Sequence, residues 1–354
     1  MTVSIPNPFR GAGLPGLTLF PESNAQAVGA LLALCPAHAQ TPLIDAHTLA
    51  REAGVARLCL KDERRRMGLG SFKALGAAYV IAHAADQARS GDDWAHALTG
   101  RTYVTASAGN HGLSVAAGAR VFGAQAVIFL SDTVPEAFAT RLRAMGARVE
   151  RAGETYEASM EAAAQAAQTE GWTLLSDSSW PGYTDLPRRV MEGYLQLAAE
   201  MVAQIDAPPT HILLQAGVGG LAGAVAAYAR LAWGETPKII VVEPEAAPAL
   251  FDSIRAGRLV TSEGPVSAMG RLDCKTPSMI ALAGLARDAD QFVTLTEDEA
   301  ALGTARLAAH GFATTPSGGA GVAALLAGVP GIGADAHVVA ILSEGPEQAG
   351  SADA

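Results

Sequence analysis

The chain has 354 residues, 49% hydrophobic and 17% charged, which excludes a protein that is disordered throughout. Its 25 Lys and Arg against 35 Asp and Glu give a formal net charge of −10, so nothing favours binding to nucleic acid or to an anionic membrane. At roughly 150 residues per domain, the length allows one large domain or two ordinary ones.

The three cysteines, Cys35, Cys59 and Cys274, lie far apart and form no Cys-x-x-Cys pair. This spacing disfavours a disulfide framework and a zinc site, and it fits a reducing compartment. The N-terminus has no basic segment followed by an apolar one, and apolar stretches such as 222–233 are shorter than the roughly 20 residues of a membrane span. We therefore expect a soluble, cytoplasmic protein without a metal.

Residues 1–54 are rich in Pro, Gly and Ala, and they indicate an extended arm on the surface with one helix over 25–34. From residue 57 onward, short β-rich runs alternate with longer alanine-rich stretches. We predict strands over 57–61, 102–106, 125–130, 148–151, 173–175, 211–215, 238–243, 291–295 and 337–343. We predict helices over 72–89, 111–122, 135–145, 155–170, 185–204, 220–233, 276–285 and 297–311.

Strands separated by helices of this length favour parallel sheets with crossover helices. Runs such as 239–242 and 338–342 are apolar throughout, which suits strands covered on both faces. The strands are too many for one modest sheet, so two sheets are the simpler account. Ligands of open α/β sheets bind beyond the carboxyl ends of the strands, and four segments there can carry chemistry.

The first segment, 68–76, places Lys73 at the start of a helix, where the helix dipole disfavours a charged amine. The alternative is an ordinary solvated lysine. The second segment, 105–112, opens a helix with hydroxyls and a glycine, which can bind a carboxylate or a phosphate. There Ser107 or Asn110 could equally cap the helix, and His111 alone suits a hydrogen bond at the helix start.

The third segment, 215–223, is a glycine-rich loop whose consecutive N–H groups can bind a phosphate. Gly217, Gly219 and Ala222 also satisfy a loose dinucleotide pattern, with Glu243 ending the next strand, so nicotinamide binding is an alternative. The fourth segment is Ser-Glu-Gly at 343–345, preceded by a glycine-rich stretch at 315–321. Taken alone, each part of it predicts only a turn.

In this order, the lysine, the Gly-Asn-His loop, the glycine loop and the late Ser-Glu-Gly resemble the pyridoxal-phosphate enzymes of fold type II, the tryptophan-synthase β-chain type. The resemblance implies an α/β fold of two three-layer αβα domains with mainly parallel sheets. It implies a large cofactor-binding domain of residues 1–84 and 191–354 and a small substrate-side domain of residues 85–190. It also implies a homodimer.

The resemblance assigns roles to single residues. Lys73, which follows Phe72, would hold pyridoxal 5'-phosphate as a Schiff base, Asn110 would contact the ring hydroxyl, and Ser343 would contact the pyridine nitrogen. The cofactor phosphate would lie on the glycine loop, which consists of Gly217, Val218, Gly219, Gly220 and Leu221. The substrate carboxylate would lie on the loop of Ser107, Ala108, Gly109 and His111.

Within that family, the stretches 68–76, 177–187 and 213–219 are most similar to the diaminopropionate ammonia-lyases, above all in the pattern Asp-x-x-Trp-x-Gly-Tyr-Thr-x-x-Pro that starts at Asp177. In those lyases this aspartate acts on the α-proton of the L-substrate; the alternative is a cap on the turn at 178–182. A second aspartate, which serves the D-substrate, stands where this chain has Ala108. The resemblance thus implies α,β-elimination from a small amino acid, expected to be L-2,3-diaminopropionate, giving pyruvate and ammonia.

Other functions stay open. Ala108 gives the Ser-Ala-Gly-Asn-His loop of threonine dehydratases, so a dehydratase of threonine, serine or 3-hydroxyaspartate is the main alternative. A nicotinamide-dependent oxidoreductase would rest on the glycine loop alone, and a non-catalytic binding protein would not need the lysine. The stretch 268–277, with Arg271, Asp273 and Lys275, is expected to line the pocket or an interface, or to be a solvated loop.

Overall fold

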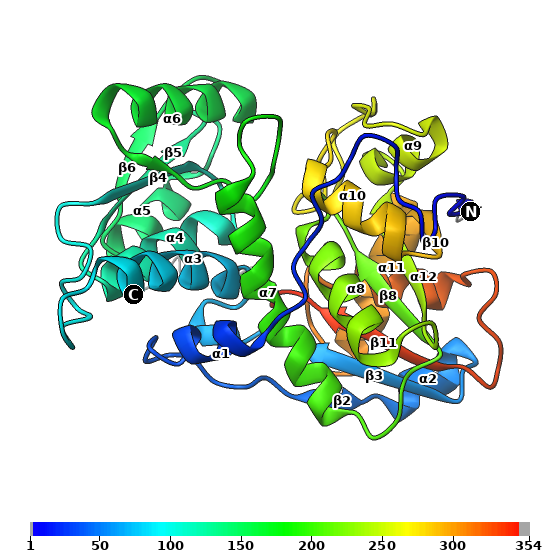
Figure 1. The fold of residues 1–354 in the computed structure, drawn as a ribbon. Helices are drawn as coiled ribbons and strands as arrows, with labels where there is room; N and C mark the ends of the chain where they lie inside the picture. The colour runs from blue at the N-terminus through cyan, green and yellow to red at the C-terminus, as the bar shows by residue number, and fades with distance from the viewer. Residues whose placement is uncertain (1–2, 347–354) are drawn as a thin grey trace.

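The computed structural model describes residues 3–346, which form two β-sheets with helices on both faces (Figure 1). The larger sheet has seven strands in the order β1-β10-β9-β8-β11-β3-β2. In that order the strands are Val3–Pro6, Gln291–Leu295, Lys238–Pro244, His211–Gln215, His337–Leu342, Arg57–Asp62 and Leu43–Asp45. The five central strands run parallel to one another, as expected for strands joined by helices.

The smaller sheet has four parallel strands in the order β6-β5-β4-β7. They are Arg148–Arg151, Gln125–Leu130, Thr102–Ala106 and Thr173–Leu174. This sheet is confined to the segment predicted as the small domain. The exact division of the chain into domains stays a prediction.

The helices lie between these strands, close to the predicted ranges. They are α1 (Gln26–Leu32), α2 (His47–Ala53), the short 3₁₀ helix η1 (Arg66–Gly68), α3 (Lys73–Ala88), α4 (Asn110–Val121), α5 (Glu136–Ala144), α6 (Tyr156–Glu170), α7 (Asp185–Gln204), α8 (Gly220–Trp233), α9 (Ala249–Ala256), α10 (Met279–Asp288), α11 (Glu297–Ala309) and α12 (Ala320–Ala327). The helix predicted over 276–285 begins later, because Ser278 has an extended backbone and precedes the first helical residue. The sequence prediction missed α2, η1, α9 and α12.

The strands of both sheets are buried on two faces. In β8, Ile212 and Leu214 pack into one apolar cluster while Leu213, between them, packs into another. In β4, Tyr103 and Val104 likewise belong to different clusters. Each sheet is therefore the middle of three layers, which confirms the predicted α/β class.

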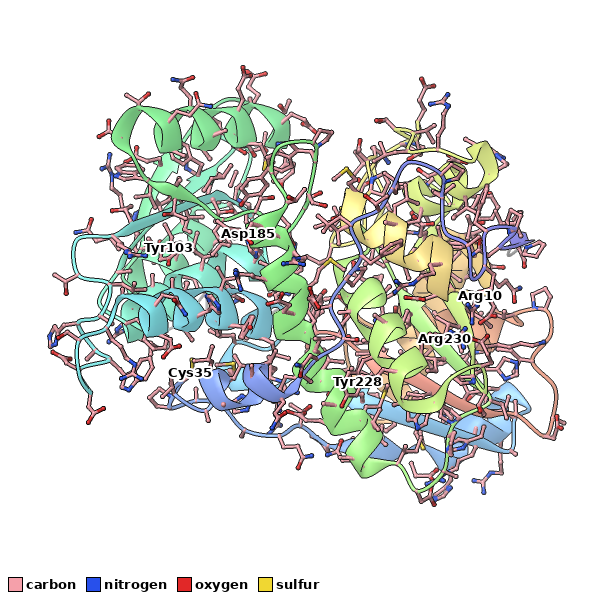
Figure 2. The ribbon with its side chains drawn as sticks, viewed as in Figure 1. Arg10, Cys35, Tyr103, Asp185, Tyr228 and Arg230 are labelled. Atoms are coloured by element: carbon pink, nitrogen blue, oxygen red, sulfur yellow. The ribbon has the colours of Figure 1, made fainter. Side chains whose placement is uncertain are left out.

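The N-terminal arm is more than a surface wrap, so that prediction was incomplete. β1 pairs antiparallel with β10, and β2 pairs antiparallel with β3, so the arm supplies both edge strands of the large sheet. Arg10 binds the carboxylate of Asp290, which also accepts from Arg230 (Figure 2). Such short edge strands carry too little periodicity to be recognised from the sequence.

Helix α7 runs between the two sheets and packs against α3 and α8 (Figure 1). The close approach of α3 depends on Gly193, because a Cβ atom there would lie 2.5 Å from the carbonyl oxygen of Leu75. The helix that carries Lys73 is thereby fixed against the long central helix.

Within residues 3–346, no helix is both long enough and apolar enough to cross a membrane. The same part of the chain contains no group of three or more His, Cys, Asp or Glu side chains that could hold a metal ion.

Candidate active site

Lys73 and Asp177, the two residues predicted to be catalytic, form an ion pair in which the Lys73 Nζ donates to Asp177 Oδ2. Lys73 is the first residue of α3 and follows β3 and η1, whereas Asp177 follows β7 of the smaller sheet. Their side chains are 22% and 18% exposed. The alternative that Asp177 only caps a local turn is wrong, because its carboxylate reaches the lysine.

This pairing overturns one expectation about Lys73. Burial alone would lower the pKa of its amine, but the charge of Asp177 and the hydrogen bond between the two outweigh burial and raise that pKa. Burial would likewise raise the pKa of Asp177, and the Lys73 charge instead lowers it. In this structure the amine is therefore charged and not neutral, because the helix dipole is weaker than a carboxylate in contact.

Of the four lysines in the sequence, Lys73 has the position that best suits a catalytic lysine. Lys61 is fully buried in an ion network with Glu200, and Lys275 is tied to Asp273 and to two carbonyl groups. Lys238 is exposed at the amino end of β9, away from the edge where ligands bind. Lys73 alone stands at the carboxyl edge with its amine next to a second catalytic candidate.

Two buried polar atoms near this pair have no hydrogen-bond partner within residues 3–346: the Tyr194 hydroxyl and the His111 Nδ1. The other nitrogen of His111, Nε2, lies 2.8 Å from the Leu175 carbonyl oxygen. Burial lowers the pKa of His111, which keeps the ring neutral. His111 thus makes the hydrogen bond expected of it near the helix start, and Tyr194 is a neighbour that the sequence analysis missed.

The Gly-Asn-His loop opens α4 without a side-chain cap, so the alternative that Ser107 or Asn110 caps this helix is wrong. Ser107 Oγ instead accepts from the backbone N–H of Gly109 at 3.2 Å. The Asn110 side-chain amide donates to the Glu344 carboxylate. The N–H groups of the first turn of α4 therefore have no side-chain cap, as expected of an anion-binding loop. Ala108 lies in the same loop, directly before Gly109.

The glycine loop from Gly217 to Leu221 connects β8 to α8. Gly219 has a φ of +94°, which favours glycine, and α8 likewise begins without a side-chain cap. A Cβ atom at Gly217 would lie 3.0 Å from Cys274 Sγ and 3.1 Å from Leu272 Cα. The backbone is therefore kept free of side chains where it borders the 268–277 stretch.

The nicotinamide alternative fails at Glu243. Its carboxylate is buried and accepts from the N–H groups of Leu250 and Phe251, both at 2.7 Å. Burial raises the pKa of this carboxyl to about 8. A side chain held in this way does not reach a ribose in front of the sheet, which the dinucleotide pattern requires.

Ser343 and Phe72 lie side by side behind the lysine. The backbone N–H of Phe72 donates to the Ser343 carbonyl oxygen at 3.1 Å, and Ser343 is itself buried. The Phe72 ring packs edge-on against the Tyr194 ring, with 4.9 Å between centroids. The structure thus joins the predicted serine, through a backbone hydrogen bond, to the residue directly before Lys73.

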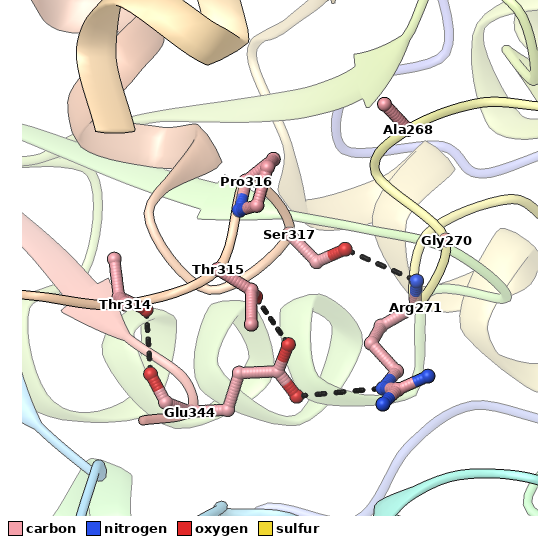
Figure 3. A pocket seen from close by; sticks show the side chains of 8 residues that line it. All are labelled: Ala268, Gly270, Arg271, Thr314, Thr315, Pro316, Ser317 and Glu344. Carbon is pink, nitrogen blue, oxygen red and sulfur yellow. Dashed lines mark hydrogen bonds and ion pairs between the residues drawn. The ribbon is translucent and has the colours of Figure 1, made fainter. Parts of the chain in front are cut away.

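A cavity of about 360 Å³ opens beside Glu344. Figure 3 shows the Glu344 carboxylate between Thr315, which donates to it, and Arg271, whose Nε lies 3.9 Å from it. The 315–321 and 343–345 segments are therefore walls of a cavity and not simple turns. The role of Glu344 was missed because its partner Asn110 is far away in the sequence.

The 268–277 stretch lines this cavity with Ala268, Gly270 and Arg271, and its role at the substrate stays a prediction. Asp273 and Lys275 bind each other at 2.7 Å, and the lysine also binds the carbonyl oxygens of Ala246 and Pro265. Of the three polar residues considered there, only Arg271 borders the cavity.

Comparisons with known proteins agree with this geometry. A family profile described as "Pyridoxal-phosphate dependent enzyme" matches residues 34–344. The diaminopropionate ammonia-lyase of Escherichia coli K12 is 33% identical over 308 residues, which cover 83% of this chain and 77% of that protein. A serine dehydratase-like protein of Rattus norvegicus is 29% identical over 300 residues, 84% of each chain.

Among solved structures, the E. coli diaminopropionate ammonia-lyase in complex with an aminoacrylate-PLP azomethine reaction intermediate matches with a TM-score of 0.85 and 29% identity. The match covers 98% of this chain and 94% of that one. Together with the family match, this establishes that the chain belongs to the pyridoxal-phosphate dependent enzymes and has the architecture of fold type II.

Proposed function

We propose that this chain is a pyridoxal-phosphate-dependent ammonia-lyase that eliminates ammonia from 2,3-diaminopropionate, with the L-isomer favoured, and yields pyruvate and ammonia. The observation that carries the proposal is the contact between Lys73 and Asp177. It joins the lysine expected to hold the cofactor to the carboxylate expected to take the α-proton. The 33% identity with the E. coli lyase supports the same substrate.

The residues of the site fit the cofactor. Lys73 would hold its aldehyde carbon covalently, and the uncapped start of α8 with the glycine loop would bind its phosphate. Asn110 and Ser343 would contact the ring hydroxyl and the pyridine nitrogen. Two buried polar atoms without partners within residues 3–346, Tyr194 Oη and His111 Nδ1, are what a ligand-binding site leads one to expect.

When bound, pyridoxal phosphate supplies the electron sink that makes the α-hydrogen of an amino acid acidic. Asp177 would take this proton through its carboxylate, or Lys73 would take it through its amine once neutral. The loop of Ser107, Ala108, Gly109 and His111 would hold the substrate carboxylate. Ser343, being neutral, would not keep the pyridine nitrogen protonated, which would favour early loss of the β-substituent over amino-group transfer.

The proposed preference for the L-isomer rests on a difference between two positions of the site, Asp177 and Ala108. Asp177 supplies a carboxylate on one side, while the residue before Gly109 is Ala108, which cannot move a proton. With a carboxylate at only one of these two positions, an α-proton that faces Ala108 would meet no carboxylate acceptor there. We therefore propose that the D-isomer is a poor substrate.

A dehydratase of a β-hydroxy amino acid is the second candidate. The Ser-Ala-Gly-Asn-His loop and the 29% identity with a serine dehydratase-like protein favour it. A carboxylate in the wall of the cavity, Glu344, is better suited to a substrate with a β-ammonium group than to one with a hydroxyl group.

Steady-state assays of pyruvate and ammonia release decide between the two. L- and D-diaminopropionate, L-serine, L-threonine and 3-hydroxyaspartate should be compared at equal concentration. We expect the L-diamino acid to have the highest kcat/KM. Turnover of L-threonine or 3-hydroxyaspartate without release of pyruvate from L-diaminopropionate would establish the dehydratase instead.

We also propose, on the family resemblance, a cytoplasmic homodimer built from a large domain of residues 1–84 and 191–354 and a small domain of residues 85–190. Light scattering of the purified protein tests the dimer. Limited proteolysis tests the domain boundaries, with cuts expected near residues 84 and 190.

A further inference from the structure

The Tyr194 side chain lies in the interior of α7, where its ring touches both parts of the candidate site. It packs on Phe72, directly before Lys73. A Cβ atom at Gly76, one turn after Lys73, would lie 2.7 Å from Tyr194 Cε1, and one at Gly220 would lie 3.6 Å from Cε2. The tyrosine therefore fills the space between the lysine helix and the glycine loop.

The hydroxyl of Tyr194 is a costly feature of this position. The residue is 1% exposed, and the oxygen has no hydrogen-bond partner within the described part of the chain. Phenylalanine would make the same ring contacts without burying an unpaired hydroxyl. A buried polar group that gains nothing in the resting structure is expected to have a partner in another state of the site.

We propose that Tyr194 is a positioning residue for Lys73, whose hydroxyl donates a hydrogen bond to the Lys73 amine when that amine is neutral. The charged amine needs no such donor, because it donates to Asp177. The neutral amine carries a lone pair that can accept a hydrogen bond. The Asp177 carboxylate has no proton to donate to it, whereas a phenol O–H can donate. The inference rests on the proposed function, since it concerns the state in which Lys73 moves protons.

The other titratable groups around the Lys73 amine come from several elements, and Tyr156, the other phenol among them, is 51% exposed and can donate to water, whereas Tyr194 is 1% exposed. These groups are Asp177, His111, Cys274, Tyr156 and Glu344. The N–H of the neutral His111 ring is used by the Leu175 carbonyl group. Burial raises the pKa of Cys274 to about 11, and a thiol is a weak donor. Glu344 is engaged by Asn110 and Thr315.

The test compares Tyr194→Phe with Tyr103→Phe. Tyr103 is a buried tyrosine of β4 in the smaller sheet, outside the site (Figure 2). The rate at which the apoprotein takes up pyridoxal phosphate is measured by absorbance from neutral pH to the highest pH at which the protein stays folded. Because Asp177 raises the pKa of Lys73, the midpoint is obtained by extrapolating the rise of this rate with pH. This titration reports the Lys73 amine and uses no substrate. Melting temperatures of both apoproteins are measured in parallel.

Loss of the donor disfavours the neutral amine, so Tyr194→Phe should move the midpoint of the uptake rate upward by about half a pH unit to one unit. Its kcat for L-diaminopropionate should fall about tenfold with KM little changed. Its melting temperature should stay equal or rise, because an unpaired hydroxyl is removed. Tyr103→Phe should leave the midpoint and kcat unchanged.

An unchanged midpoint of the uptake rate in Tyr194→Phe overturns the inference. If the melting temperature is also lowered, the hydroxyl has a structural role instead. Protein that takes up pyridoxal phosphate but releases no pyruvate from diaminopropionate contradicts the proposed function instead. In that case a shifted midpoint in Tyr194→Phe still supports the role of Tyr194.

Discussion

Two lysines twelve residues apart, Lys61 and Lys73, each bind a carboxylate on a distant element, and their surroundings differ. The Lys61 amine has three partners: Glu200 Oε2 and the Thr41 carbonyl oxygen, both at 2.7 Å, and Gln204 Oε1 at 3.0 Å. Within residues 3–346 the Lys73 amine has one hydrogen-bond partner, Asp177, and it lies 5.6 Å from the centroid of the Phe72 ring. Lys61 is 0% exposed in its side chain and Lys73 is 22% exposed.

The groups around each lysine extend this contrast. Beside Lys61, the buried Arg66 binds both Glu63 and Glu200, which gives two cations and two anions with close partners. Beside Lys73, the Tyr194 hydroxyl and His111 Nδ1 have no partner within residues 3–346, and near the Lys61 network His38 Nδ1 also has none, although the charged side chains of that network are all paired. A saturated buried network specifies structure, whereas unpaired buried polar atoms cost stability and are typical of sites that perform chemistry. A buried lysine–carboxylate pair is therefore not in itself a sign of function.

The largest expected effect is that of Lys73→Ala on turnover. Because no other lysine stands at the site, release of pyruvate should fall by at least about a thousandfold. The absorbance of the bound cofactor near 410–420 nm should vanish, a range typical of a lysine-bound pyridoxal group. Full turnover in this variant would contradict the role assigned to Lys73.

The largest loss of stability is expected when Glu200, the partner of Lys61, is replaced. Glu200→Gln leaves Lys61 and Arg66 buried with only Glu63 as a counter-charge, and we expect a loss of about 3–5 kcal/mol in the free energy of unfolding. Urea unfolding measures this loss. A loss below about 1 kcal/mol would mean that the network contributes little.

The same glutamate should make the fold sensitive to acid. Burial would raise the pKa of Glu200, but the hydrogen bonds and charges of Arg66 and Lys61 lower it to about 2. Between its ordinary value of 4.5 and about 2, the unfolded chain binds a proton that the folded chain does not. Up to about 3 kcal/mol of stability is therefore lost as the pH falls through this range. Urea unfolding at several pH values should show this slope in the wild type and not in Glu200→Gln.

A smaller change in stability than that of Glu200→Gln is expected from Asp177→Asn, the matched change beside Lys73. The Lys73 and Asp177 side chains are more exposed than the Lys61 pair, and Asn can still accept a hydrogen bond, so the loss should be about 1–2 kcal/mol. Turnover of L-diaminopropionate should nevertheless fall about a hundredfold, because the proton acceptor is removed. Asp185→Asn, on an exposed side chain at the start of α7, serves as the control and should leave both quantities unchanged. Equal stability losses in Glu200→Gln and Asp177→Asn would remove the contrast between the two lysines.

Much of the fold could be predicted because its signals are local. The strand over 211–215 has the predicted bounds, since an apolar run ends there at a glycine loop. Helices such as α12 (Ala320–Ala327) were missed because apolar residues on all sides leave no polar face and so no apolar stripe. The edge strand Val3–Pro6 is defined by its pairing with β10, which no local pattern contains.

The residues of the site that lie in sequence motifs with a known role could be predicted. Lys73 and Asp177 follow from patterns, and the structure brings them into contact. The role of Glu344, although it lies in the Ser-Glu-Gly motif, and the place of Tyr194 at the site do not follow from patterns. The binding of Glu344 to Asn110 joins the ends of two different sheets, and Tyr194 has the spacing of an ordinary core residue within α7. Such residues are recognised by their contacts and not by their spacing.

Reduction of the loaded protein with borohydride, followed by peptide mapping, tests the central claim most directly. The chain has only four lysines, so the mass added by the trapped cofactor can be assigned to Lys61, Lys73, Lys238 or Lys275 without ambiguity. We predict that the peptide with Lys73 alone carries the added mass. Mass added to the peptide of another lysine, with that of Lys73 unmodified, would contradict the assignment.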